Sequence, residues 1–235
     1  MQLIVKNSRS TTVGCREPDL QAIAHDAFEA HSSVFYWITD DQKMDGITTC
    51  GICSNDMPWY LREMQPFDPL NIARLSGSKK RVATLSIDRN LAPANEFDYY
   101  EKYMQSCGIY DVLDFLFWDG PRAIAGLGVI KTKNDPPITT ETIRVARSIQ
   151  PLLESKLHSH PKIVGQRLRR RLREDYNLTE REVDVANLIR GGLTNRQISE
   201  ELNIAEGTVK THLWNLFQKL QVSNRTMISV RLAAL

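Results

Sequence analysis

Signals that start and stop helices recur at short intervals near the C-terminus of this chain of 235 residues. Thr179 and Glu182 have the Ser/Thr-x-x-Glu spacing of a capping box, which begins a helix. Gly191–Gly192 ends that helix, and Thr194 caps a second, shorter one. Two more helical segments follow before the end of the chain. The sequence therefore predicts an all-α domain of four helices over residues 175–235.

The third helix of this domain, expected over about residues 206–220, has two different faces. Its apolar residues recur at helical spacing and must face a core: Val209, Leu213, Leu216, Phe217 and Leu220. Two helices joined by a tight turn, the second polar on its outer face, are what reading of the DNA major groove requires. We therefore expect DNA contacts from the polar residues of this helix, namely Glu206, Thr208, Lys210, Thr211 and Asn215.

The start of the second helix, at Thr194, Asn195 and Arg196, is a candidate phosphate site. The first backbone N–H groups of a helix have no partner within the helix, so they attract anions. Such contacts would fix the position of the protein on the DNA duplex without reading its sequence.

The C-terminal segment resembles the LuxR-type helix-turn-helix, over nearly all of residues 178–232 and without a gap. The matching positions are Leu178–Thr179, Arg181–Glu182, Gly192–Asn195, Ile198, Leu202, Ile204, Thr208–Lys210, His212, Asn215, Lys219–Leu220, Val222 and Asn224–Arg225. The resemblance implies a four-helix domain, dimerisation through the last helix and binding to palindromic promoter DNA. It places Thr208, Val209, Lys210 and His212 in or beside the recognition surface, and Lys219 on the DNA backbone.

Three features of the segment depart from that pattern. Ala205 stands where the family usually has Ser, so the third helix lacks its usual N-cap, worth about 1 kcal/mol. Gln197 and Ser199 replace the more usual Glu and Ala in the second helix. Trp214, on the third helix, is interpreted as a partly buried aromatic residue that packs against the core, and a contribution to base or backbone contacts with DNA is the alternative.

A basic segment, 161–174, precedes this domain and is interpreted as a linker. From Lys162 to Arg173 it carries six basic residues and no acidic one, although the net charge of the whole chain is only +2. Two interpretations stay open for it. The block lies near a polyanion such as DNA, or it is a solvated connection without a partner.

Residues 1–160 are predicted to form an α+β domain with an antiparallel sheet flanked by helices. Apolar runs at 33–39, 46–53 and 81–87 predict strands, and residues 111–118 run through Asp119–Gly120 into a hairpin. Pro121 favours a loop of more than two residues there. Helices are expected near residues 18–28, 95–108 and 140–158.

Three classes of sensor were compared with this first domain. A phosphorylated receiver domain is excluded because the required Asp and Lys residues are not at the right strand ends. An acyl-homoserine-lactone sensor matches in part, at Trp59 and Asp68–Pro69, but Glu63 stands where that pattern has Tyr. A broader GAF- or PAS-like ligand-binding domain is favoured. Its concave sheet face would be lined by Phe35, Trp37, Trp59, Tyr60, Asp68, Leu85, Phe115 and Phe117.

Together these features predict a bacterial transcription regulator controlled by a small molecule. A lactone receptor, and a regulator whose first domain serves only dimerisation or protein contact, are the alternatives. The expected partners are palindromic double-stranded DNA, a small-molecule ligand, a second copy of the chain and RNA polymerase. We find no catalytic motif and expect no enzymatic activity, cofactor or metal; Cys50 and Cys53 form an isolated CxxC. Without a membrane-spanning run or signal peptide, the chain is expected to be cytoplasmic.

Overall fold

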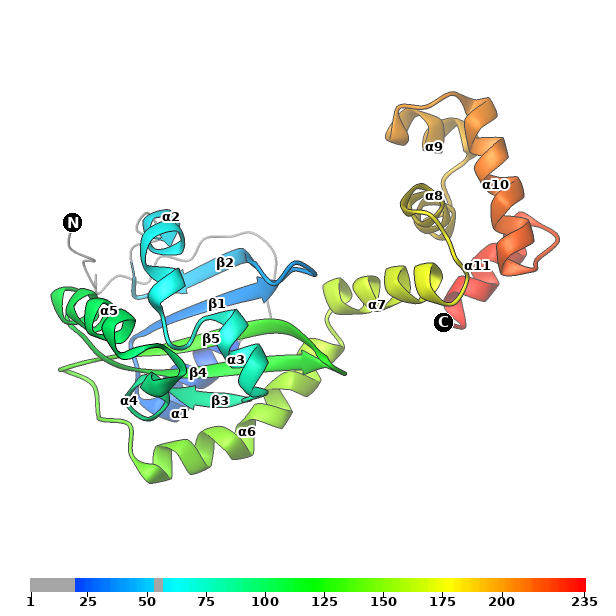
Figure 1. The fold of residues 1–235 in the computed structure, drawn as a ribbon. Helices are drawn as coiled ribbons and strands as arrows, with labels where there is room; N and C mark the ends of the chain where they lie inside the picture. The colour runs from blue at the N-terminus through cyan, green and yellow to red at the C-terminus, as the bar shows by residue number, and fades with distance from the viewer. Residues whose placement is uncertain (1–19, 53–56) are drawn as a thin grey trace. The chain divides into compact units, whose positions relative to one another are not determined.

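The computed structural model describes residues 20–52 and 57–235, which form two compact units. The first unit ends at His158, and the second runs from Ser159 to Leu235. Figure 1 shows a sheet covered by helices in the first unit and helices alone in the second.

The first unit is built on a five-stranded antiparallel sheet in the order β2-β1-β5-β4-β3. Its strands are β1 (Ser32–Ile38), β2 (Met44–Cys50), β3 (Val82–Thr84), β4 (Ile109–Asp119) and β5 (Arg122–Thr132). The helices are α1 (Leu20–Phe28), α2 (Met57–Trp59), α3 (Ile72–Ser78), α4 (Leu85–Asp88), α5 (Ala94–Ser106) and α6 (Thr140–His158); further helical turns follow α2 as far as Phe67 and follow α4 as far as Leu91. The predicted α+β fold is confirmed.

Helices cover both faces of the sheet, and this explains why the central strands are rich in apolar residues. On one face Phe28 of α1 contacts Phe115 of β4, with ring centroids 5.7 Å apart. On the other, Tyr100 and Met104 of α5 join Tyr36 and Leu116 in one buried cluster. Because side chains alternate between the faces, strands buried on both sides are apolar at most positions and not only at every second one.

Two details of the strands differ from the sequence prediction. The hairpin loop has two residues, since Asp119 pairs with Arg122, and the expectation of a longer loop is wrong. Gly120 has φ +60°, and a positive φ followed by the negative φ of Pro121 suits a tight hairpin turn. The strand expected over residues 81–87 ends at Thr84, where the Asp88 carboxylate accepts the Thr84 N–H (2.9 Å) and the chain turns into α4.

The ring of Tyr36 lies against Gly126 of the neighbouring strand. A Cβ atom at Gly126 would lie 2.2 Å from Cζ of Tyr36, far inside contact distance. Gly128, two residues on, is different, because its nearest neighbour would be Cγ1 of Val112 at 3.8 Å. Glycine at position 126 therefore makes room for a buried aromatic ring.

This contact predicts that Gly126→Ala lowers the stability of the first unit by about 1–3 kcal/mol, as overpacking does in a close-packed core. The measurement is the urea midpoint of the full chain, followed by circular dichroism. Gly128→Ala on the same strand is the matched control and is expected to leave the midpoint nearly unchanged. Equal midpoints for the two variants would contradict the role of Gly126.

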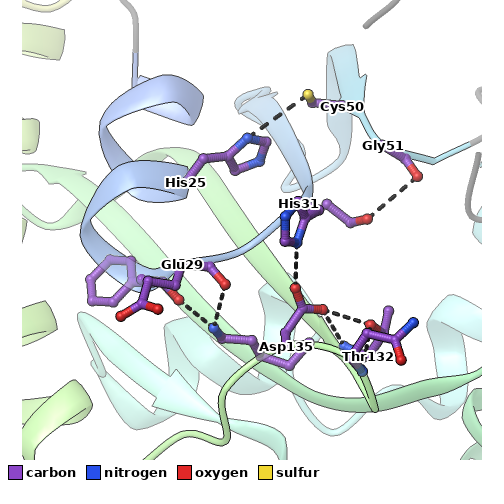
Figure 2. Close-up of polar contacts among 11 residues, drawn as sticks. His25, Glu29, His31, Cys50, Gly51, Thr132 and Asp135 are labelled. Carbon is purple, nitrogen blue, oxygen red and sulfur yellow. Dashed lines mark hydrogen bonds and ion pairs between the residues drawn. The ribbon is translucent and has the colours of Figure 1, made fainter. Parts of the chain in front are cut away.

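Polar contacts hold α1 and the ends of the sheet together (Figure 2). Buried Lys131 donates to the carbonyl oxygens of Phe28 and Glu29 and so caps the end of α1. The imidazole of His31 lies 2.7 Å from the Asp135 carboxylate, and His25 lies 4.0 Å from the Cys50 thiol. Cys53 lies outside the described residues, and the described ranges contain no group of three His, Cys, Asp or Glu side chains able to hold a metal ion.

The second unit has five helices around its own core. They are α7 (Pro161–Glu174), α8 (Glu180–Arg190), α9 (Asn195–Leu202), α10 (Glu206–Leu220) and α11 (Arg225–Ala233). The last four match the predicted four-helix domain. The segment interpreted as a basic linker is the helix α7, and its Leu168 and Leu172 are buried in the same core.

Candidate DNA-binding and ligand-binding sites

The first helix of the DNA-binding candidate begins as the sequence predicts. In the capping box of α8, the Glu182 carboxylate accepts the Thr179 N–H (2.8 Å) and the Thr179 hydroxyl accepts the Glu182 N–H (3.3 Å). Gly191 ends the helix, and Gly192 follows with φ +83°. The local signals alone therefore fix both ends of α8.

The helix α9 begins with a second capping box, formed by Thr194 and Gln197. The Gln197 amide oxygen accepts the Thr194 N–H at 2.9 Å, so Gln serves here as Glu would. Arg225 of α11 donates to the Leu193 carbonyl and to the Asn195 side chain (3.1 Å), which ties this helix start to the last helix. Arg196 is exposed and pairs with Glu200 at 3.1 Å.

A tight turn joins α9 to α10. Asn203 ends α9 with φ +50°, a left-handed conformation that Asn tolerates better than most residues. Ala205 stands at the N-cap of α10 and makes no side-chain cap, as its sequence implies. The backbone N–H groups at the start of α10 therefore have no side-chain cap, and the Thr208 N–H bonds to the Ala205 carbonyl (2.9 Å).

The exposed surface of α10 holds most of the residues that the sequence assigns to DNA binding. Glu206, Thr208, Lys210 and Thr211 are exposed, and His212 and Asn215 are half-buried. Val209 is 0% exposed and packs in the core, so placing it in the recognition surface is wrong as far as its side chain is concerned. Val209 belongs to the apolar repeat of α10, and the side chains of that repeat face the core of the domain.

Lys219 and Trp214 have surroundings that the sequence did not reveal. The Lys219 ammonium donates to the Glu182 carboxylate (2.7 Å) and to the Asn177 carbonyl (2.9 Å), so it is engaged within the domain. Trp214 is 62% exposed, and its interpretation as a core residue is wrong. It follows buried Leu213 by one position, which turns it to another side of α10.

Three basic residues of α7, Arg169, Arg171 and Arg173, pair with groups of their own unit. Arg169 contacts Glu180 (3.1 Å) and Asp184 (2.9 Å), and Arg173 contacts Glu180 at 2.6 Å. Arg171 donates to the carbonyl of Leu235. The excess of positive charge in this segment is therefore offset in part by the start of α8, which a composition count along the chain does not show.

The first unit contains a cavity of about 90 Å³ between one face of the sheet and the helices that cover it. Four groups of residues line it: Val34, Tyr36 and Met44 from β1 and β2; Ile52, Met57, Tyr60, Asp68 and Leu70 from the segment that follows; Tyr100, Tyr103 and Met104 from α5; and Ile109, Val112, Asp114, Gly128 and Ile130 from β4 and β5.

A hydrogen-bond network around Asp68 forms one side of the cavity. Its carboxylate accepts the Tyr60 hydroxyl at 2.5 Å and the Leu70 N–H at 2.8 Å, and it also interacts with the Tyr100 hydroxyl. Burial raises the pKa of the Asp68 carboxyl, although these hydrogen bonds oppose the change. Burial also raises the pKa of Tyr60 and of Tyr100, so both phenols stay neutral.

A second carboxyl, Asp114, projects from β4 into the same cavity. Burial and the neighbouring charge of Asp68 raise its pKa well above the usual range. Burial likewise raises the pKa of Tyr36, which faces it from β1. Among the described residues, neither Oδ1 of Asp114 nor the Tyr36 hydroxyl has a hydrogen-bond partner.

The residues predicted to line a ligand pocket divide into three groups. Tyr60 and Asp68 do line the cavity, and Trp59 lies beside it, with its ring 5.5 Å from that of Tyr103. Leu85 belongs to the same buried cluster but lies away from the cavity. Phe35, Trp37, Phe115 and Phe117 point to the opposite face of the sheet, so their assignment to the cavity is wrong.

That error has a simple geometric cause. Side chains alternate along a strand, so a choice one residue out of step selects the opposite face. The cavity takes Val34 and Tyr36 from β1 and Val112 and Asp114 from β4. An acidic residue within the apolar run of β4 was the available signal for Asp114.

Comparisons with known proteins agree with the geometry of the second unit. Residues 176–232 match the model of the luxR family of bacterial regulatory proteins. The chain is 29% identical over 238 residues to the monoamine regulon transcriptional regulator of Klebsiella aerogenes, covering 98% of this chain and 95% of that protein. It is 39% identical over 108 residues to the transcriptional regulatory protein LiaR of Bacillus subtilis, covering 43% of this chain and 48% of that protein.

Among solved structures, that of Escherichia coli SdiA covers 92% of this chain and 87% of its own, with 18% identity and a TM-score of 0.42. None of the helices in the described part of the chain is long and apolar enough to cross a membrane. The matched proteins are regulators of transcription and not enzymes, in agreement with the sequence. The C-terminal domain belongs to the luxR family of bacterial regulatory proteins, and the chain is a transcription regulator with a helix-turn-helix DNA-binding domain.

Proposed function

We propose that this protein binds palindromic promoter DNA as a homodimer in the cytoplasm, with α10 in the major groove, and that a small molecule in the first unit controls it. One observation carries the DNA-binding part. Behind a tight turn, α10 presents Glu206, Thr208, Lys210 and Thr211 to solvent while its opposite face is buried. A helix so anchored can enter the groove without disturbing its own core.

The start of α9 supports the same arrangement. The side chains of Thr194 and Asn195 are held by Gln197 and Arg225, so the backbone there has a fixed position. A fixed helix start near exposed Arg196 is suited to a DNA phosphate. We propose that α9 positions the domain on the phosphate backbone and that α10 reads the bases.

The proposal predicts that Lys210→Ala weakens specific DNA binding by about 1–3 kcal/mol if Lys210 contacts a base edge. A phosphate contact would instead weaken binding to all sequences alike and reduce the salt dependence by about one counterion. Fluorescence anisotropy, with DNA fragments selected from a random pool by the full-length protein, measures both. Lys102→Ala, an exposed lysine of α5, makes the same charge change in the first unit and serves as the control. Wild-type affinity and salt dependence in Lys210→Ala would refute the proposed role of α10.

The sensor part of the proposal is supported by the cavity of the first unit. Buried polar groups that converge on an apolar cavity are typical of small-molecule sites. The name of the Klebsiella aerogenes relative suggests monoamines as one class of signal to test. Acyl-homoserine lactones are the alternative that Trp59 and Asp68–Pro69 favour, and a first unit that serves only dimerisation or protein contact is the other.

Thermal shift of the full-length protein against a panel of metabolites, amines and acyl lactones tests this part. We expect at least one compound to raise the melting temperature and to change DNA affinity in the same concentration range, since a ligand acts only through different affinities for two states. No shift with any compound, together with constitutive DNA binding, would favour the role in dimerisation.

A further inference from the structure

Asp114 is a buried carboxyl in the cavity wall that its own protein leaves partly unsatisfied. Its side chain is 7% exposed, and it interacts with the backbone N–H of Phe115. Its Oδ1 has no hydrogen-bond partner among the described residues. Buried polar groups without partners are rare in folded proteins, because each one loses its hydration without replacing it.

A positive charge beside Asp114 would stabilise its carboxylate, which burial and the charge of Asp68 both disfavour. The carboxyl of Asp68 acts on it from the same cavity, and Tyr36 faces it with an unpartnered hydroxyl. The described residues that line the cavity include no lysine or arginine. Among the residues that the structure describes, none lining the cavity supplies this charge, whereas a ligand with a cationic group would.

Asp68 and Asp114 differ in a way that separates their roles. The Asp68 carboxylate accepts hydrogen bonds from Tyr60 and from the Leu70 N–H. Those contacts leave it little capacity for a ligand, and they fix its position. Asp114, in contrast, has an oxygen without a hydrogen-bond partner among the described residues, and this oxygen can accept from a ligand. The residue opposite Asp114 on β5 is Gly128, and because glycine has no side chain, the space beside Asp114 stays open.

From this geometry we propose that the cavity binds a small primary monoamine, whose ammonium group donates to Asp114 and to the Tyr36 hydroxyl. This inference rests on the proposed role of the first unit as a sensor. The apolar body of the amine lies among Met44, Met104 and Ile130, and the tyrosine rings of the wall offer faces that attract cations. Asp114 is thereby the residue that selects an amine over a neutral molecule of the same shape.

The size of the cavity limits the body of the amine. At about 10–15 Å³ for each water-sized position, 90 Å³ accommodates on the order of six to nine non-hydrogen atoms. Benzylamine is a probe of that size.

Binding of the amine also has a predicted proton balance. Because burial and Asp68 raise the pKa of Asp114, its carboxyl in the free protein holds a proton at a pH where an exposed Asp does not. The phenols of Tyr36, Tyr60 and Tyr100, which face the cavity from β1 and the covering helices, stay neutral. When the ammonium group arrives, Asp114 gives its proton to the buffer, and the ion pair forms. Affinity therefore rises with pH until the free amine itself loses its proton.

Isothermal titration calorimetry of the full-length protein tests the inference with benzylamine and its neutral counterpart, benzyl alcohol. We expect benzylamine to bind at least about tenfold more tightly, as a charge-assisted hydrogen bond implies. Titration in two buffers of different ionisation enthalpy at one pH should show up to about one proton released for each amine bound. Equal affinity for the two probes would overturn the inference.

Asp114→Asn provides the second arm, because the amide has the shape of the carboxyl without its charge. We expect it to lower the affinity for benzylamine at least about tenfold and to abolish proton release. Tyr36→Phe, which removes only the hydroxyl, should lower the affinity by a smaller factor. The melting temperature of Asp114→Asn without amine should equal or exceed that of the parent, since a buried carboxyl is removed. Unchanged affinity in a folded Asp114→Asn variant would refute the role of Asp114.

The outcome separates this inference from the sensor proposal beneath it. If neutral compounds or lactones bind and change DNA affinity while amines do not, the sensor stands and the amine assignment is wrong. If no small molecule binds, both are wrong.

Discussion

Leu216→Ala is expected to lower the stability of the helical unit by about 2–5 kcal/mol, the usual cost of removing a buried leucine. Leu216 lies in the middle of α10 and is 0% exposed within the core of the unit. Its loss leaves a cavity beneath the helix that carries Thr208, Lys210 and Thr211. Because that helix is placed by its buried face, specific DNA binding should weaken together with stability.

Hydrogen exchange of the full-length protein gives the measurement. Amides of α8 and α10 should exchange faster in Leu216→Ala, while those of the sheet keep their protection, since the two units have separate cores. Trp214→Ala is the matched control, because Trp214 sits on the same helix but is largely exposed. It is expected to change protection by less than about 0.5 kcal/mol. A loss in Trp214→Ala as large as that in Leu216→Ala would contradict the description of α10.

Glu182→Ala is expected to lower the stability of the helical unit by about 2–3 kcal/mol. Its carboxylate is 3% exposed, accepts the Thr179 N–H and pairs with Lys219. Breaking a fully buried ion pair costs about 3–5 kcal/mol, and the partial exposure of Lys219 reduces this figure. The change removes half of a capping box and, at the same time, the carboxylate that pairs with Lys219.

Glu182→Gln separates these two effects. Gln keeps the capping box, as Gln197 shows at the start of α9, but its neutral amide cannot form an ion pair with Lys219. We expect Glu182→Gln to lie between the parent and Glu182→Ala in urea titration and hydrogen exchange. If both variants were equally unstable, the capping box would contribute nothing.

The same residue predicts a pH dependence with a defined sign. Burial alone would raise the pKa of Glu182, but the hydrogen bonds from Lys219 and Thr179 outweigh it and lower the pKa below its ordinary value of 4.5. A carboxyl with a depressed pKa stabilises the folded state above its unfolded pKa, and this stability is lost as pH falls through the folded pKa. The stability difference between the parent and Glu182→Gln should therefore shrink in acid. A stability difference that stays constant as the pH falls through the folded-state pKa of Glu182 would contradict the ion pair.

Much of the helical unit could be predicted from the sequence because its signals are local. A capping box joins residues three apart, and Gly192 provides a positive φ wherever the rest of the chain lies. Thr179, Thr194 and the apolar repeat of α10 therefore determine helix ends and a buried face by themselves. The same repeat had already placed Val209 in the core, and only its assignment to the recognition surface by resemblance was wrong.

Partners distant in the sequence could not be predicted in this way. Lys219 meets Glu182 across 37 positions, and Arg225 meets Asn195 across 30. An isolated lysine or arginine on a helix looks available for DNA until the fold supplies its partner. The basic run of α7 is a similar case, since Arg169 and Arg173 meet the acidic start of α8 only when the helices pack.

The sequence by itself determined the helix-turn-helix and the antiparallel sheet, whereas only the tertiary structure decided which side of the sheet holds the cavity. The two sides of β1 and β4 are both largely apolar because helices cover both. The alternation of side chains along these strands therefore does not tell which face holds the cavity. The packing of the covering helices on each face decides it. Phe35 and Phe115 are buried on one face, where Phe28 of α1 packs on Phe115, whereas the covering helices leave a cavity beside Tyr36 and Asp114 on the other. A buried carboxyl without a full set of partners exists only once that second face is closed.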